Sequence, residues 1–231
     1  MPAVVAVITY GLLHRLDGPY FAIGTWVVAE VLRLATSVFG YVNAGAGMSL
    51  RVMSSYSPME RAVGISLLSA LMLLVAVGGS YLLLRSRYGL ALVAIRDNPV
   101  AAASQGVNVG LLKFLIWVAA AVGTGLAGAI YFMAQLRITP PAAYSPTWAN
   151  VSIFIVMVGG LGSLEGVLIG ALVYFVADRW FAQYGATYLV VLGLLALVRA
   201  LFARGGLWGL IQKATNASWF PTRRRLMEDR T

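Results

Sequence analysis

The chain has 231 residues, of which 60% are hydrophobic and only 11% are charged, and its formal net charge is +9. A soluble domain carries about 25% charged residues, so this composition indicates a polytopic membrane protein. The absence of cysteine excludes disulfides and thiolate chemistry, and the single histidine, His14, excludes a multi-histidine metal site. Net positive charge in a membrane protein indicates basic cytoplasmic loops rather than nucleic-acid binding.

Apolar segments in chain order predict an all-α membrane protein with about five membrane segments. A bilayer span needs about 20 mostly apolar residues, and residues 2–14 fall short of this length. Longer apolar segments cover residues 19–40, 64–84, 114–135, 151–177 and 187–202. Residues 41–63 are polar and are expected to form a loop, as is the proline-bearing segment 136–150.

Glu30 and Arg33 lie inside the first long segment, three residues apart. That spacing puts them on one helix face, where they can form an ion pair. Charged side chains inside a bilayer are costly and by default mark a functional site. The alternative is that both lie near a membrane surface and extend their charged groups toward water.

The polar stretch 85–113 contains the signals of a short helix. Asn98 is a suitable N-cap, because its side-chain oxygen can accept hydrogen bonds from the first turn. Pro99 suits the first helical position, and Gly106 can adopt the left-handed conformation that closes a helix. The sequence therefore predicts a two-turn helix over 99–105, too short to be stable alone and suited to docking on a partner.

The distribution of basic residues sets the expected orientation. Segment 85–113 has four basic residues and the chain from Arg199 onward has seven, so both are predicted to be cytoplasmic and loop 136–150 external. Two full spans over 151–177 and 187–202 would then leave the basic tail outside. A re-entrant hairpin that turns at Gly159–Gly166 removes this conflict. The alternatives are a tail that is external despite its charge, or a different way of crossing the membrane at residues 178–186.

Residues for enzymatic chemistry are missing from the predicted spans. The four aspartates fall at segment ends or in loops, and the sequence has neither a His-Glu-x-x-His motif nor a P-loop. A membrane body that lacks a nucleotide site but carries a docking helix indicates a transport subunit driven by a partner chain. Broken helices are where transporters place substrate paths, so the glycine-rich break is a candidate part of such a path.

Three stretches together resemble the membrane permeases of branched-chain amino acid ABC transporters, specifically the M-subunit (LivM-like) type. They are LDGPYFAIGTWVVAEVLRL from Leu16, RYGLALVAIRDNPVAAASQGVNV from Arg87, and VGGLGSLEG from Val158. Their order and spacing agree with the family over essentially the whole chain. The sequence departs from the family pattern at Asn98-Pro99, where the family usually has Glu, and at Asp17, where it usually has Arg.

The resemblance implies a permease subunit of an importer in a bacterial inner membrane, with a cytoplasmic C-terminus and no catalytic, metal or cofactor site of its own. It implies two ATPase subunits, a second permease subunit, an extracytoplasmic substrate-binding protein and membrane lipid as partners. The resemblance assigns the ATPase-coupling role to Ala94, Ile95, Arg96, Asp97, Asn98, Ala101, Ala102 and Gly106. Candidate path residues are Thr25, Glu30, Gly159, Gly160, Gly162 and Ser163, with helix packing as the alternative for each glycine.

The family's members have several spans ahead of the Tyr20-Phe21-Ala22-Ile23 stretch, so the expected organisation is an N-terminally shortened transmembrane domain over 1–205 and a basic tail over 206–231. The expected substrates are branched-chain or related amino acids. Two alternatives are a partner-independent transporter or channel, and a non-functional permease fragment. The former predicts coupling carboxylates in mid-span, and only Glu30 qualifies.

Overall fold

A computed structural model describes residues 2–38, 45–51, 56–160 and 162–181, together with 183, 190, 193–194 and 208–209. The chain divides into two compact units, Met1–Ser145 and Pro146–Thr231. Most of the predicted span 187–202 and all but two residues of the predicted tail 206–231 lie outside the described residues, as does the predicted domain boundary at residue 205.

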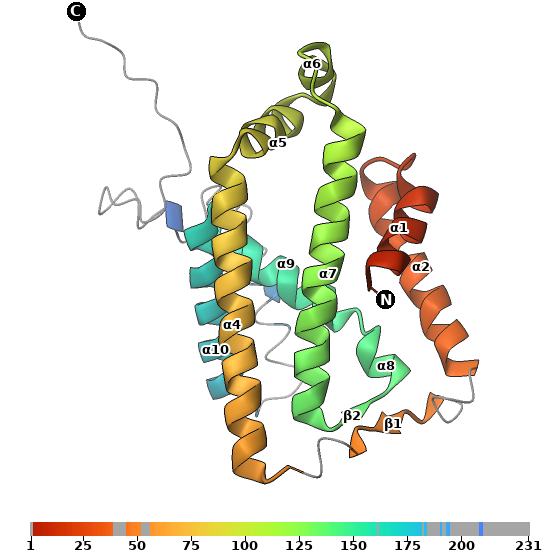
Figure 1. Cartoon of the computed structure of the whole chain (residues 1–231), viewed down its shortest axis with the longest axis vertical. Coiled ribbons are helices and arrows are strands. Elements are labelled where there is room, and N and C mark those ends of the chain that lie inside the picture. Colours follow the sequence, from red (N-terminus) through yellow and green to blue (C-terminus); the bar gives the residue numbers. More distant parts are fainter. Residues whose placement is uncertain are drawn as a thin grey trace, which may run out of the picture. The chain divides into compact units, whose positions relative to one another are not determined.

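The first unit is built from helices and one very short β-ladder. Its elements are α1 (Pro2–Leu13), α2 (Pro19–Val38), β1 (Met48–Ser49), α4 (Pro58–Arg85), α5 (Arg87–Asp97), α6 (Pro99–Ser104), α7 (Val109–Gln135), β2 (Arg137–Ile138) and α8 (Pro140–Ala143). The long helices α4 and α7 pack side by side, with α5 and α6 at one end and β1 and β2 at the other (Figure 1). The second unit contains α9 (Thr147–Gly159) and α10 (Leu164–Phe181).

The predicted polytopic helical membrane fold is confirmed. Within the described residues, four helical stretches are long and apolar enough to cross a bilayer: α2, α4, α7 and Pro140–Gly159. Large apolar side chains along α4 point outward, for example Leu67 at 66% and Leu74 at 71% exposure, as expected of a helix in contact with lipid. The helix α1, with 12 residues, is shorter than a span, as the sequence predicts.

The Pro140–Gly159 stretch reaches its length only by combining α8 and α9, which are separated by residues 144–146. The helix α9 has 13 residues and is therefore about 20 Å long at 1.5 Å per residue. A hydrocarbon core is about 30 Å thick, so α9 alone is too short to cross it.

Side-chain hydrogen bonds attach α1 to α7 in antiparallel fashion. The indole Nε1 of Trp117 donates to the backbone oxygen of Ala6 over 3.0 Å, and the Tyr10 hydroxyl donates to the backbone oxygen of Gly110 over 3.2 Å. A Cβ atom at Gly125 would lie 2.7 Å from Cβ of Pro2, so this glycine permits the close approach of the two helices.

Capping side chains rather than apolar residues define the starts of α4 and α7, which lie earlier in the chain than hydropathy predicts. The helix α4 begins at Pro58 instead of residue 64: Ser57 Oγ accepts from the Glu60 N–H, and Glu60 Oε2 accepts from the Ser57 N–H over 3.0 Å. The helix α7 begins at Val109 instead of residue 114, where Asn108 Oδ1 accepts from the Leu111 N–H over 3.0 Å.

Candidate functional site

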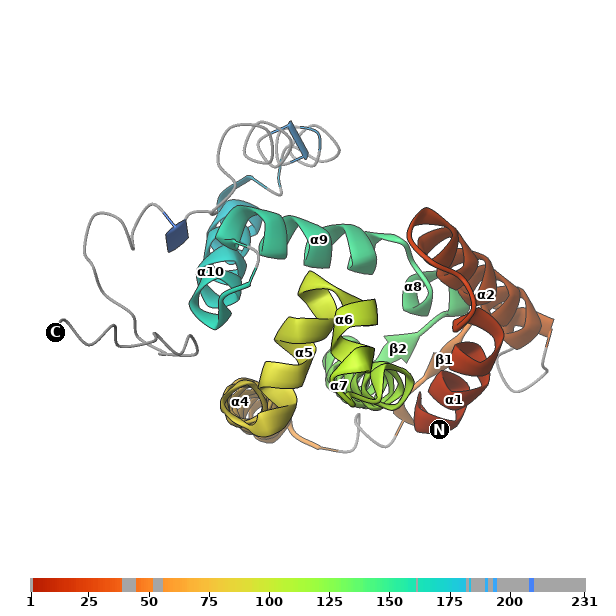
Figure 2. The ribbon, with the colours of Figure 1, turned by 90° about the horizontal axis from the view of Figure 1, so that it is seen from above.

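The polar segment between α4 and α7 folds into two short helices that meet at Asn98, and we call residues 87–107 the elbow. Viewed from above, α5 leads from the end of α4 toward α7, and α6 lies beside the end of α7 (Figure 2). The turn out of α4 is tight, because a Cβ atom at Gly89 would lie 2.2 Å from the backbone oxygen of Leu84. The elbow is thus held close to the ends of both long helices.

The predicted short helix is confirmed as α6, one residue shorter than expected. Asn98 Oδ1 accepts from the N–H groups of Val100 and Ala101, both over 3.0 Å, and Pro99 occupies the first turn. Gly106 has a φ of +84°, and the Val107 N–H donates to the oxygen of Ala102 over 3.1 Å. This pattern is a Schellman motif, which satisfies carbonyls that the helix end would otherwise leave unpaired.

The eight residues predicted to couple to an ATPase differ in exposure. Ile95 and Ala102 are buried, with 8% and 2% of their surface exposed, and Ala94 is half-buried, so these three residues face away from solvent. The other five are exposed: Arg96, Asp97, Asn98, Ala101 and Gly106. Arg96 Nη2 and Asp97 Oδ1 form an ion pair over 3.1 Å, with side chains 65% and 64% exposed.

The two helices of the second unit cross at a patch of three glycines. A Cβ atom at Gly159 would lie 1.8 Å from the backbone oxygen of Gly166, and one at Gly170 would lie 2.0 Å from that of Ile155. Beyond this patch, Phe154 packs edge-on against Tyr174 with ring centroids 6.0 Å apart. Backbones can approach this closely only where side chains are absent.

The predicted break between the two helices is confirmed, but it spans residues 160–163 rather than Gly159–Gly166. Gly160 and Gly162 have φ values of +125° and +88°, which side-chain-bearing residues rarely adopt. Ser163 Oγ accepts from the Gly166 N–H over 3.2 Å and caps the first turn of α10. Four of the predicted path residues, Gly159, Gly160, Gly162 and Ser163, therefore have structural roles in this crossing.

Glu165 is the one buried charged residue among those that the structure describes, with 3% of its surface exposed. It lies in the first turn of α10, where the positive end of the helix dipole favours a carboxylate. Glu165 was not among the predicted site residues, because a carboxylate within a glycine-rich segment gives no sign of burial in the sequence.

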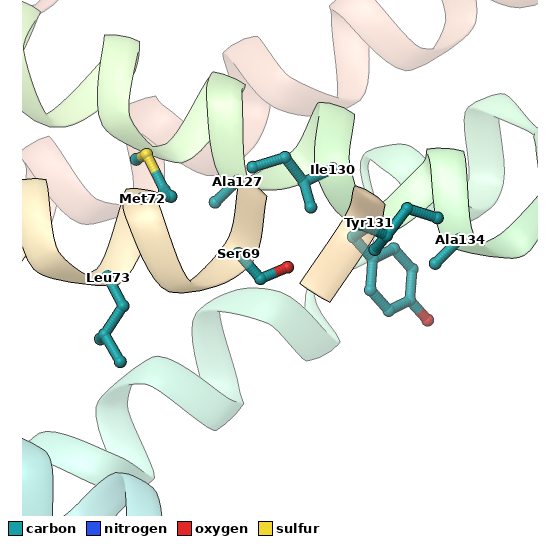
Figure 3. A pocket seen from close by; sticks show the side chains of 8 residues that line it. Ser69, Met72, Leu73, Ala127, Ile130, Tyr131 and Ala134 are labelled. Carbon is teal, nitrogen blue, oxygen red and sulfur yellow. The ribbon is translucent and has the colours of Figure 1, made fainter. Parts of the chain in front are cut away.

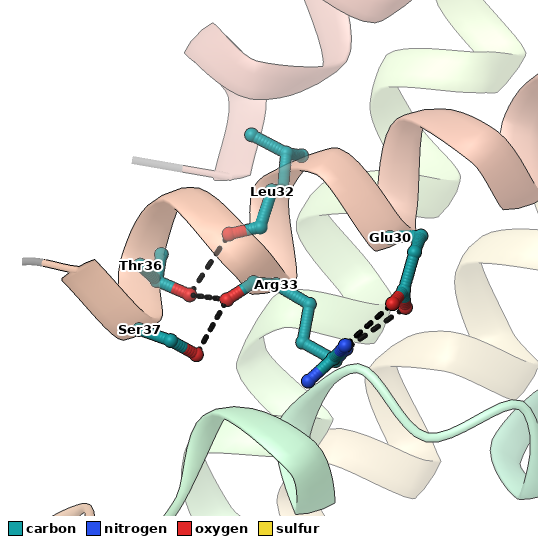
Figure 4. Close-up of polar contacts among 5 residues, drawn as sticks. All are labelled: Glu30, Leu32, Arg33, Thr36 and Ser37. Carbon is teal, nitrogen blue, oxygen red and sulfur yellow. Dashed lines mark hydrogen bonds and ion pairs between the residues drawn. The ribbon is translucent and has the colours of Figure 1, made fainter. Parts of the chain in front are cut away.

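Glu30 and Arg33 form the predicted ion pair on α2 (Figure 4). Arg33 Nε donates to Glu30 Oε2 over 2.8 Å, and Arg33 Nη2 donates to Glu30 Oε1 over 2.5 Å. The Glu30 side chain is 48% exposed and that of Arg33 is 29% exposed. Arg33 bends back toward Glu30 rather than toward the C-terminal end of α2 (Figure 4).

The pair lies near the middle of a 20-residue helix, with Glu30 about 16 Å from its first residue at 1.5 Å per residue. A charged residue at the centre of a membrane helix costs about 2.5–3.5 kcal/mol on insertion scales. Facing lipid would therefore be unfavourable, and the pair is expected to face protein or water. The sequence predicted the pair but placed only Glu30, not Arg33, in the path.

Thr25, the remaining predicted path residue, donates from its hydroxyl to the backbone oxygen of Ala22 over 2.7 Å. Thr36 and Ser37 likewise donate to the oxygens of Leu32 and Arg33, each over 2.8 Å (Figure 4). These hydroxyls use their protons within α2. The charged groups of Glu30 and Arg33 are thus the strongest polar groups that this part of the helix offers.

A shallow groove of about 390 Å³ lies between α4 and α7. Its walls are apolar except for Ser69 and Tyr131 (Figure 3), and the Tyr131 hydroxyl accepts from Gln135 Nε2 over 3.1 Å. The groove has no charged lining and suits an aliphatic chain. In the part of the chain that the structure describes, no three His, Cys, Asp or Glu residues gather as a metal site would require.

Comparison with known proteins identifies a family model that matches most of the chain and relatives that match part of it. Residues 1–201 match the family model described as branched-chain amino acid transport system / permease component. The high-affinity branched-chain amino acid transport system permease protein LivM of Escherichia coli K12 is 24% identical over 152 residues, 66% of this chain and 36% of LivM. No solved structure matches the chain.

Two further relatives carry different descriptions. A probable branched-chain amino acid transport permease protein, LivH of Methanocaldococcus jannaschii, is 29% identical over 54% of this chain and 39% of its own length. The autoinducer 2 import system permease protein LsrC of Klebsiella pneumoniae is 32% identical over 58% of this chain and 43% of its own length. The chain thus spans less than half the length of the curated relatives it matches.

Proposed function

The chain belongs to the family of branched-chain amino acid transport system permease components, and we propose that it acts as a membrane permease subunit of an ABC importer. In this role it forms part of the translocation path and is moved by a separate ATPase chain. It performs no covalent chemistry itself.

The structure of the elbow is the observation that supports coupling to an ATPase. Its short helix is closed at both ends, by Asn98 and by the Schellman motif at Gly106, so its conformation is well defined. Its helices contact α4 and α7, and Ile95 and Ala102 are buried, whereas Val100 is 76% exposed. A force applied to the exposed face of the elbow would therefore be transmitted to α4 and α7, which a flexible loop could not do.

The proposed orientation places the elbow in the cytoplasm of a bacterial cell, with loop 136–150 outside and the C-terminus cytoplasmic. The support is the concentration of Lys and Arg in segment 85–113 and beyond Arg199. The partners in this proposal are two ATPase subunits, a second permease subunit and an extracytoplasmic binding protein.

The proposed substrates are branched-chain or related amino acids. The names of the LivM and LivH relatives support this class. The LsrC relative is named for import of autoinducer 2, so family membership alone does not define the substrate.

Co-purification of the chain with its ATPase tests the proposal. We expect the double substitution Arg96→Ala with Asp97→Ala to weaken the complex by about tenfold or more. The substitution removes the hydrogen bonds of two charged side chains to the ATPase, and a hydrogen bond to a charged group contributes about 1.5–3 kcal/mol. The measurement is the amount of ATPase retained by affinity-tagged chain in detergent, over a series of ATPase concentrations.

An Arg61→Ala substitution at the other end of α4 is the control, and it should leave ATPase retention unchanged. The exposed Arg96–Asp97 pair contributes little to folding, so the double variant should unfold at the same temperature as the wild type. Equal ATPase retention by the double variant and the wild type would contradict the role assigned to the elbow.

A further inference from the structure

We propose that the Glu30–Arg33 pair binds the charged ends of a zwitterionic α-amino acid as it crosses the membrane. Glu30 would take the ammonium group and Arg33 the carboxylate. This inference rests on the proposed transport function, and it adds Arg33 and a defined ligand chemistry to the path.

The geometry of the ion pair leaves hydrogen-bonding groups available on both partners. Arg33 uses Nε and Nη2 toward Glu30, and its Nη1 makes no hydrogen bond to the described residues. Nη1 and the second N–H of Nη2 form the end of the guanidinium, which can bind a carboxylate through two parallel hydrogen bonds. Each Glu30 oxygen accepts one bond from Arg33 and retains lone pairs for an ammonium group.

The spacing of these groups matches the proposed ligand. In an α-amino acid the ammonium and carboxylate groups are bonded to the same carbon, so the two charges are close together. The carboxylate of Glu30 and the guanidinium of Arg33 are likewise adjacent, within 2.8 Å of one another. A zwitterion can therefore contact both partners together, and the ion pair need not open.

The position of the Glu30–Arg33 pair along α2 favours a place on the substrate path over one that faces lipid. Glu30 lies near the middle of α2, and its side chain is 48% exposed in this chain. A zwitterion at that depth meets the same unfavourable environment as a charged side chain. A neutral but strongly dipolar pair provides compensating charges for both of its ends without adding net charge to the membrane.

Ligand binding to the purified chain in lipid nanodiscs tests this inference directly. The probes are L-leucine, L-leucinamide, which lacks the carboxylate, and 4-methyl-2-oxopentanoate, which lacks the ammonium group. Ligand-observed saturation-transfer NMR titrations give an apparent Kd for each probe. The control variant is Ser37→Ala, because Ser37 bonds within the same helix and leaves the pair intact.

We expect Arg33→Gln to weaken leucine binding by about tenfold and to leave leucinamide binding unchanged, because a charge-assisted hydrogen bond is lost only for the carboxylate. Glu30→Gln should weaken leucine binding by a similar factor and spare the oxo acid. Ser37→Ala should match the wild type for all three probes. This selectivity separates ligand contact from a purely structural role, which would affect every probe equally.

Three results would overturn the inference: no leucine binding by the wild type, an equal loss for all probes in both variants, or unchanged leucine binding with weakened association between copies of the chain. The last result would make the pair an interface element. The assay needs no ATPase, so a chain that retains its ATPase but fails to bind leucine contradicts this inference and leaves the proposed importer function standing.

Discussion

At the residue scale, individual glycines in this chain have different structural roles, and the sequence alone does not distinguish them. Gly159 and Gly170 allow two backbones to touch, whereas Gly160 and Gly162 supply backbone conformations that other residues avoid. Gly128 lies within α7, and beyond its chain neighbours and the local helix backbone no atom of the described residues lies within 4 Å of a Cβ placed there. The sequence offered helix packing as the alternative to a path role for the hairpin glycines, and the contacts at Gly159 support packing.

Substitution of Gly159 by Ala tests this distinction. The added methyl would lie 1.8 Å from the backbone oxygen of Gly166, so the helices must separate, and we expect a loss of about 1–3 kcal/mol in stability. The matched change Gly128→Ala adds the same atom in open space and should be neutral or stabilising by up to about 1 kcal/mol. Thermal unfolding of both variants in detergent, followed by circular dichroism, measures the difference. Equal unfolding temperatures would contradict the close crossing.

At the element scale, the elbow shows how local signals define a short helix. The Asn-Pro start and the Gly end were readable in the sequence, and α6 forms between them. The preceding helix, α5, was not predicted, because the single residue Ser86 is both the C-cap of α4 and the N-cap of α5, and no polar gap separates the two helices. A change of direction between consecutive helices leaves little trace in hydropathy.

Asn98→Ala should loosen the first turn of α6. The loss of the cap costs about 1 kcal/mol, which corresponds to about fivefold faster amide hydrogen exchange in residues 100–105. Asn98→Asp keeps an oxygen that can accept from Val100 and Ala101, so its exchange should resemble that of the wild type. Hydrogen exchange followed by mass spectrometry on the elbow peptide distinguishes the two variants. Faster exchange in both, or in neither, would argue against the cap.

At the scale of the whole molecule, the orientation proposed from the basic residues and the hairpin proposed for 151–177 make one joint prediction. The chain contains no cysteine, so single cysteines can be introduced without a background signal. A membrane-impermeant maleimide added to intact spheroplasts should label Ala142→Cys and Gln183→Cys. Ala103→Cys, in the elbow, should react only after the membrane is opened.

Labelling at residue 183 from the cytoplasmic side alone would contradict the re-entrant hairpin. Residue 142 serves as the control for an external position and residue 103 for an internal one. Reversed labelling of these two controls would contradict the proposed orientation as a whole.

The sequence by itself determined the membrane class, the spans of α2, α4 and α7, and the break within the glycine-rich segment. These properties follow from local quantities: the length of an apolar run sets whether it can cross a bilayer, and glycines permit a break. Helix ends were less accurate, because Ser57 and Asn108 extend α4 and α7 past their apolar parts.

Only the tertiary structure decided which predicted site residues are buried and which are exposed. Ile95 and Ala102 face inward and Arg96 and Asp97 outward, although all four lie in one short polar stretch. It also showed that Gly159 contacts α10 and that Arg33 turns back toward Glu30. Burial and close backbone approach depend on contacts with other elements, which no local pattern in the sequence records. The three-residue spacing of Glu30 and Arg33 predicted that they pair, but not the geometry of their hydrogen bonds.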